Sequence, residues 1–127
     1  MEKLAELVEI SRRKAEIDKA GDWGADPILY LNEIKNEVDE VLEELPKQRL
    51  CYLEDELADV LWDYINAVIA LEANGAASID SVLERACRKY QERVSAIESG
   101  KSWESIKEKQ KRALKLENGR IQSVGNP

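Results

Sequence analysis

The chain has 127 residues and a net charge of −7, from 19 basic and 26 acidic residues. Its length suits one domain with a core of its own, and its 43% hydrophobic and 35% charged composition is typical of a globular protein. The acidic balance excludes non-specific binding to a nucleic-acid polymer, which needs a basic surface. The absence of histidine excludes histidine-dependent nucleophile triads and the Glu-x-x-His di-iron sites of ferritin-like bundles.

We expect no targeting signal at the beginning of the chain. Residues 1–17 alternate charged and apolar residues and lack the apolar run of a signal peptide. No stretch is long and apolar enough to span a bilayer. Cys51 and Cys87 form no CxxC pair, so we expect them to be buried, reduced thiols. These features predict a cytoplasmic protein with no membrane partner.

Start and stop residues divide the chain into five expected helices in a single all-α domain over residues 1–117. Asp26 and Pro27 are an N-cap acid and a first-turn proline, and Ser78 and Ser102 are further N-caps. Glycines or prolines follow the helix ends. The expected helices cover residues 2–20, 26–45, 50–73, 78–99 and 103–116.

The remaining residues, 118–127, form a C-terminal tail with two alternative structures. Asn118-Gly119 is a favoured dipeptide for a tight hairpin turn, and apolar residues flank it. A frayed, disordered terminus is the other alternative. The sequence favours neither.

The helix expected over residues 50–73 carries its acids on one narrow side. At about 100° per residue, its polar positions after the first turn fall in a sector about 80° wide that holds no lysine or arginine. These positions are Glu56, Asp59, Asp63 and Asn66. The rest of the helix is apolar, so we expect it at the centre of a bundle or at a subunit interface.

The preceding helix supplies a second acidic row, Glu33, Glu37, Glu40 and Glu44, beside an apolar stripe that we expect to face the core. The stripe consists of Leu31, Ile34, Val38, Val41, Leu42 and Leu45. The short connection over residues 46–49 predicts antiparallel packing, which brings the acids of the two helices face to face. Converging carboxylates repel and raise one another's pKa values unless a divalent cation lies between them. Oxygen ligands alone favour Mg²⁺ or Mn²⁺. The alternative is that these acids only solubilise an exposed helix face.

The acids also match a family signature. Glu37-Val38-Asp39-Glu40, followed after fifteen residues by Glu56-Leu57-Ala58-Asp59, resembles the ExxE…ExxD signature of MazG-type nucleoside triphosphate pyrophosphohydrolases. Lys89 and Arg93 resemble the family's Lys-x-x-x-Arg, and SWESIKEKQKR resembles its closing W-x-x-I-K helix. The similarity covers about residues 23–112. Asn36 and Asp55 depart from the doubled glutamates that many members carry before each motif.

The resemblance implies a fold and an activity. The fold would be an antiparallel bundle of about four to five helices, completed by assembly into a homodimer or homotetramer. The activity would be Mg²⁺-dependent hydrolysis of a nucleoside triphosphate, (d)NTP, to the monophosphate and pyrophosphate, in cleansing of the nucleotide pool.

The resemblance also implies roles for single residues. The metal ligands would be Glu37, Glu40, Glu56 and Asp59, and either Glu37 or Glu40 would activate the water. Lys89 and Arg93 would contact phosphates, although outside the family pattern they would be an ordinary solvated pair. Further expected substrate contacts are Asp63, Asn66 and Trp23, the last by stacking on a base.

Three alternatives stay open at this point. Two keep the fold and change the substrate: a phosphoribosyl-ATP pyrophosphohydrolase or a deoxynucleotide-specific relative. The third is a non-catalytic helical dimerisation module whose acids bind a basic partner.

Overall fold

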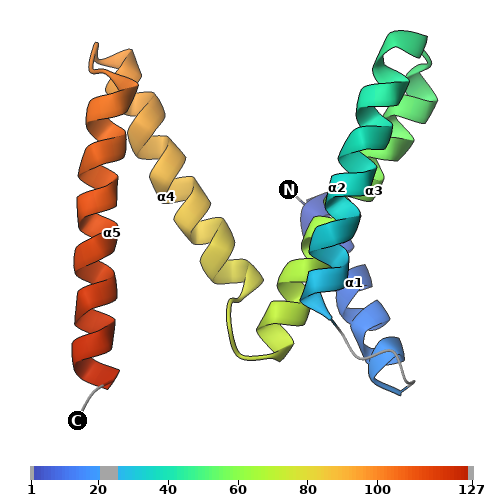
Figure 1. Ribbon diagram of the computed structural model, residues 1–127, viewed down its shortest axis with the longest axis horizontal. Coiled ribbons are helices and arrows are strands. Elements are labelled where there is room, and N and C mark those ends of the chain that lie inside the picture. The colour runs from blue at the N-terminus through green and yellow to red at the C-terminus, as the bar shows by residue number, and fades with distance from the viewer. Residues whose placement is uncertain (1, 21–25, 126–127) are drawn as a thin grey trace. The chain divides into compact units, whose positions relative to one another are not determined.

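The computed structural model describes residues 2–20 and 26–125, which are almost entirely helical (Figure 1). The elements are α1 (Glu2–Ala20), α2 (Pro27–Glu44), the 3-10 helix η1 (Leu45–Lys47), α3 (Leu50–Ala73), α4 (Ile79–Glu98) and α5 (Trp103–Gly125). These two ranges contain no strand, so the predicted all-α class is confirmed. None of the described helices is long and apolar enough to cross a bilayer. Cys51 and Cys87 are both exposed, so the expectation that they are buried is wrong.

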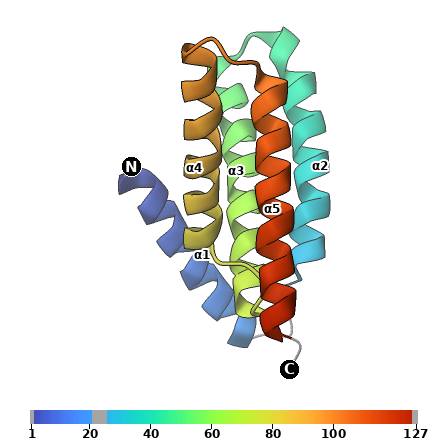
Figure 2. The same cartoon turned by 90° about the vertical axis from the view of Figure 1, so that its left-hand side faces the viewer.

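The helices fall into two compact units, Met1–Ser81 and Val82–Pro127. In the first unit, α2 and α3 run antiparallel, side by side, and α1 lies obliquely across α3 (Figure 2). In the second unit, α4 and α5 are antiparallel and joined by a short turn. The single domain predicted over residues 1–117 stays a prediction.

The helix boundaries follow the capping residues. The Asp26 side chain accepts a hydrogen bond from the Ile28 backbone N–H at 2.9 Å, which satisfies one free donor in the first turn of α2. Gly75 (φ 77°) and Gly100 (φ 84°) follow α3 and α4 in the left-handed conformation that glycine adopts without strain.

The end of the chain differs from the prediction, because α5 continues to Gly125 instead of stopping at Leu116. The structure therefore has a helix where a hairpin at Asn118-Gly119 was one alternative. Glycine inside a helix costs about 1 kcal/mol, but an isolated two-stranded hairpin is at best marginally stable. Arg85 of α4 also pairs with Glu117 at 2.6 Å, one residue before this dipeptide.

Helix α3 provides the core of the first unit. Its residues Ile65–Ala70 are all buried, so the helix is covered on every side at this level. Asn66 accepts a hydrogen bond from Ser11 of α1 at 2.9 Å and donates one to the Trp62 carbonyl at 2.8 Å. Both polar side chains are buried, and each is satisfied by these bonds, as burial requires.

The apolar stripe predicted to be the core face of α2 is largely exposed, which corrects that expectation. Leu31, Val38, Leu42 and Leu45 are each more than 40% exposed. Ile34 and Val41 of the stripe are covered as expected, and Tyr30, Glu37 and Glu44 are covered beside them. Helix α2 therefore turns part of its acidic row towards α3, and the four exposed side chains of the stripe have no partner among the described residues of the first unit.

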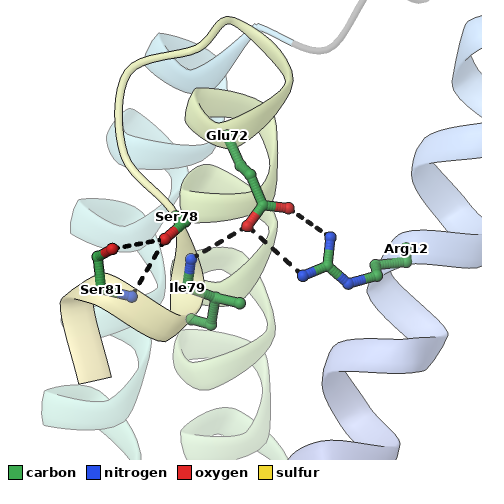
Figure 3. A network of polar contacts seen from close by, with 5 residues as sticks. All are labelled: Arg12, Glu72, Ser78, Ile79 and Ser81. Carbon is green, nitrogen blue, oxygen red and sulfur yellow. Dashed lines mark hydrogen bonds and ion pairs between the residues drawn. The ribbon is translucent and has the colours of Figure 1, made fainter. Parts of the chain in front are cut away.

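The Glu72 carboxylate links three segments of the first unit (Figure 3). It pairs with Arg12 of α1 and accepts a hydrogen bond from the Ile79 backbone N–H at 3.3 Å, at the start of α4. Ser78 caps the same helix by accepting from the Ser81 N–H at 3.1 Å. The hydrogen bond from Arg12 holds the pKa of the Glu72 carboxyl below its ordinary value.

We expect Glu72→Gln to lower the free energy of unfolding by about 1 kcal/mol at pH 7, because it removes a charge-assisted pair whose Arg12 side chain is 42% exposed. A group with a lowered pKa stabilises the fold above its unfolded-state pKa, and this contribution disappears as the pH falls. The difference from the wild type, measured by urea denaturation, should therefore shrink at pH 3.

The matched control is Glu84→Gln, which changes an exposed glutamate that lies 4.0 Å from Arg88 and should leave stability nearly unchanged. A loss for Glu72→Gln that is equally large at pH 3 and pH 7 would contradict the ion-pair explanation.

Candidate metal centre

Six carboxylates of α2 and α3 meet along the interface of the two helices, and we call them the acidic centre. They are Glu33, Glu37, Glu40, Glu56, Asp59 and Asp63. Oxygens of Glu37, Glu56 and Asp59 lie within 4.8 Å of one another. Oxygens of Glu33, Glu37 and Asp63 form a second group of the same size. Glu37 belongs to both groups, so it lies at the middle of the acidic centre.

The acidic centre contains carboxylate oxygens that are buried without a partner. Oε2 of Glu37 and Oε2 of Glu56 are shielded from solvent and have no hydrogen-bond partner in the described ranges. None of the ion pairs formed by the described residues involves any of the six acids. Unpaired buried carboxylates are costly, and a hard divalent cation with oxygen ligands would satisfy them. The residues therefore fit a magnesium-type ion.

Crowding of like charges raises the pKa values of carboxyls in the acidic centre. Burial, and then the neighbouring Glu40 carboxyl, raise the pKa of Glu37 to about 7. Contact with Glu40 is the largest cause that raises the pKa of Glu56. Glu40 lies outside both three-residue groups, but its carboxyl lies close to those of Glu37 and Glu56. All four acids of the two motifs are thus near one another.

The other substrate-contact residues predicted on the first unit have different environments. Asp63 faces the acidic centre, and burial raises its pKa. Asn66 does not face it: both polar groups of its buried side chain are used in contacts with α1 and α3. Helix α1 crosses α3 at this level, and its Ser11 bonds the amide, while the substrate contact expected of Asn66 stays a prediction. Trp23 lies outside the described residues.

Lys89 and Arg93 belong to the second unit, where they line an open groove of about 370 Å³ between α4 and α5. Arg93 is 9% exposed, and its Nε donates to Gln110 of α5 at 2.7 Å. Its guanidinium carbon lies 5.0 Å from the ring centre of Trp103. Arg93 therefore helps to hold α4 against α5. The groove has a basic lining, formed by Arg85, Arg88, Lys89, Arg93, Lys107 and Lys111 beside two glutamates.

One member of the acidic centre was not predicted as a site residue. Glu33 belongs to the group formed with Glu37 and Asp63, but the motif comparison starts at Glu37. The sequence spacing could have identified Glu33 as a member of the acidic centre. It lies four residues before Glu37 and so projects from the same side of α2.

A family model described as the MazG nucleotide pyrophosphohydrolase domain matches residues 26–97, which is more than half of the chain. The matched range begins at the N-cap of α2 and contains the whole acidic centre together with Lys89 and Arg93. Searches of curated proteins and of solved structures each gave no match. The family match supports nucleotide pyrophosphohydrolase activity in general.

We expect Glu37→Gln to raise the melting temperature of the metal-free protein at pH 7.5, by roughly 3 °C for each kcal/mol of repulsion removed. A carboxyl with a raised pKa destabilises the fold as the pH rises from its unfolded-state value to its folded-state value, here about 7. The gain should therefore shrink at pH 5, where Glu37 is protonated. Thermal denaturation in a chelator measures both values.

Adding Mg²⁺ should raise the melting temperature of the wild type more than that of Glu37→Gln, because the variant lacks one carboxylate of the acidic centre. The control is Asp39→Asn, which removes an exposed acid of α2 outside the acidic centre. If the wild type, Glu37→Gln and Asp39→Asn have equal melting temperatures in the chelator at pH 7.5, repulsion within the acidic centre does not destabilise the fold.

Proposed function

The chain belongs to the MazG nucleotide pyrophosphohydrolase family, and we propose that it hydrolyses nucleoside triphosphates to monophosphate and pyrophosphate with the help of Mg²⁺. One observation carries the proposal: the acids of both family motifs converge at one place with two buried oxygens that have no partner in the described part of the chain. A surface that only solubilises the protein would place such oxygens in water.

Glu37, Glu40, Glu56 and Asp59 are the proposed metal ligands, and Mn²⁺ is the expected substitute for Mg²⁺. When bound, the cation supplies positive charge that offsets both the carboxylates and the triphosphate. Glu33 and Asp63 extend the same carboxylate surface along the helices. We therefore propose that Asp63 acts on the substrate through the bound cation and does not touch the substrate directly.

The proposed reaction is attack by water on the α-phosphorus, which breaks the bond to the bridging oxygen and releases pyrophosphate. A carboxylate of the centre accepts the proton that the water loses. Glu37 and Glu40 are the candidates for this role. Of these two acids, the one that is not fully engaged with the cation would accept this proton.

Lys89 and Arg93 are proposed to bind phosphate oxygens and to stabilise the charge that develops on the leaving pyrophosphate. The bond to Gln110 and the contacts with Tyr90 and Trp103 hold the Arg93 guanidinium in one orientation. Preorganised donors of this kind lose little entropy when they bind an anion. Lys89 lines the same basic groove and has no ion-pair partner among the described residues.

We also propose that the chain assembles with copies of itself into a dimer or tetramer. The support is the apolar stripe of α2, whose four leucine and valine side chains named above remain more than 40% exposed. Leu57, Leu61 and Tyr64 of α3 are exposed to a similar extent. Exposed apolar side chains gathered on neighbouring helices are typical of a subunit interface.

The activity is tested with a panel of NTPs and dNTPs, including phosphoribosyl-ATP, in the presence of Mg²⁺. Products resolved by ion-exchange chromatography should be the monophosphate and pyrophosphate. Glu56→Gln and Asp59→Asn should each lower kcat/KM by about 100-fold or more, because each removes a proposed metal ligand. Asp39→Asn should leave the activity near the wild-type value. Release of orthophosphate with a diphosphate would refute the proposed bond cleavage.

Self-assembly is tested by light scattering coupled to size exclusion. The wild type should have two or four times the chain mass of 14.4 kDa. Leu42→Glu should shift it to the monomer, because it introduces a charge into the apolar stripe of α2, where Leu42 is 58% exposed. The matched control is Leu116→Glu on α5, a leucine that is 62% exposed and lies outside the stripe. A monomeric wild type would contradict the proposal.

A further inference from the structure

The connection between α2 and α3 has a well-defined conformation. Helix α2 ends at Glu44, the 3-10 helix η1 follows, and Gln48 adopts the left-handed conformation with φ 54° and ψ 42°. Among the described residues, Gln48 is the one non-glycine residue with a positive φ. This conformation costs about 1 kcal/mol or more for an L-residue, so the surrounding contacts must hold it in place.

An ion pair closes this connection. The Arg49 guanidinium donates from Nε to Oε2 of Glu44 at 3.0 Å and from a terminal nitrogen to Oε1 at 2.6 Å. The Glu44 side chain is only 7% exposed. The guanidinium carbon also lies 4.0 Å from the ring centre of Tyr52, one turn into α3. Two parallel hydrogen bonds set the orientation of the partners as well as their distance.

The ion pair lies at the same distance from the acidic centre along both helices. Glu37 precedes Glu44 by seven residues on α2, and Glu56 follows Arg49 by seven residues on α3. At a rise of 1.5 Å per residue, both carboxylates lie about 10 Å from the ion pair. Because the helices are antiparallel, equal spacing brings Glu37 opposite Glu56, and their oxygens do lie within 4.8 Å.

The same pair separates Glu44 from the rest of its acidic row. Glu33, Glu37 and Glu40 have no ion-pair partner in the described ranges, whereas Glu44 is neutralised by Arg49. The bond to Arg49 lowers the pKa of Glu44, in contrast to the raised pKa of Glu37. Glu44 therefore serves the connection and adds no further repulsion to the acidic centre.

We infer that the Glu44–Arg49 ion pair is a register clamp, which holds α2 against α3 so that Glu37 faces Glu56 across the metal centre. Arg49 is thus a positioning residue that does not touch the metal or the substrate. A slide of one residue would move the carboxylates by about 1.5 Å, far more than the few tenths of an ångström that metal coordination tolerates. The inference rests on the proposed function, because it concerns the same metal centre.

The test measures Mn²⁺ affinity by isothermal titration calorimetry on the full chain, with no substrate present. Arg49→Ala should weaken Mn²⁺ binding by about 10-fold or more, which is the usual effect of losing a residue that orients metal ligands. Arg49→Lys keeps the charge but not the two-pronged contact, so it should weaken binding as well, by a smaller factor. Circular dichroism verifies that each variant retains its helix content. If Arg49→Ala is unfolded, the Mn²⁺ affinity of Arg49→Lys tests the inference.

The matched control is Arg12→Ala, which breaks a second arginine ion pair among the described residues of the first unit. Arg12 and Arg49 are similarly exposed, at 42% and 45%, but Arg12 pairs with Glu72, away from the α2–α3 connection. Arg12→Ala should lower stability and leave the Mn²⁺ affinity within about twofold of the wild type. Equal affinities of the wild type and both Arg49 variants would overturn the clamp, as would an equal loss in Arg12→Ala. Absence of Mn²⁺ binding in the wild type would instead overturn the proposed function.

Discussion

The repulsion between carboxylates on α2 and α3 is the constraint around which the first unit is organised. Two helices that bury apolar side chains against each other would normally keep acids at the outer edges of their interface. Here Glu37 and Glu56 each have an oxygen shielded from solvent without a partner in the described chain. The remaining contacts of the unit hold the two helices together in spite of this cost.

Packing along the α2–α3 interface is the most extensive in this unit, and polar contacts also attach α1 to α3. The buried pair of Ser11 and Asn66 and the ion pair of Arg12 and Glu72 attach α1 to α3 at two levels. Buried polar contacts of this kind specify a particular alignment of two helices, because an offset leaves donors and acceptors unpaired. These bonds fix α1 on α3, whereas α2 packs along α3 and is joined to it by the connection through Arg49.

Much of the fold was predictable from the sequence, because caps and breakers act locally. The Asp26-Pro27 start of α2 and the glycines after α3 and α4 place the helix ends within a few residues. The extent of α5 was not predictable, because Asn118-Gly119 favours a turn locally, whereas the structure continues the helix through it. The four acids of the two motifs were recognisable from their spacing. The face of α2 that is covered, the placement of Asn66 against α1 and the pairing of Glu44 with Arg49 depend on how helices pack, which periodicity alone does not determine.

The division into two units also separates the charges of the molecule. Residues 1–81 hold 8 basic and 20 acidic residues, whereas residues 82–127 hold 11 basic and 6 acidic ones. A polyanion that diffuses towards a chain of net charge −7 is therefore repelled by one unit and attracted by the other. Such attraction acts over about 8 Å at physiological ionic strength, so added salt would weaken the capture of a free nucleotide more than that of one already neutralised by a cation.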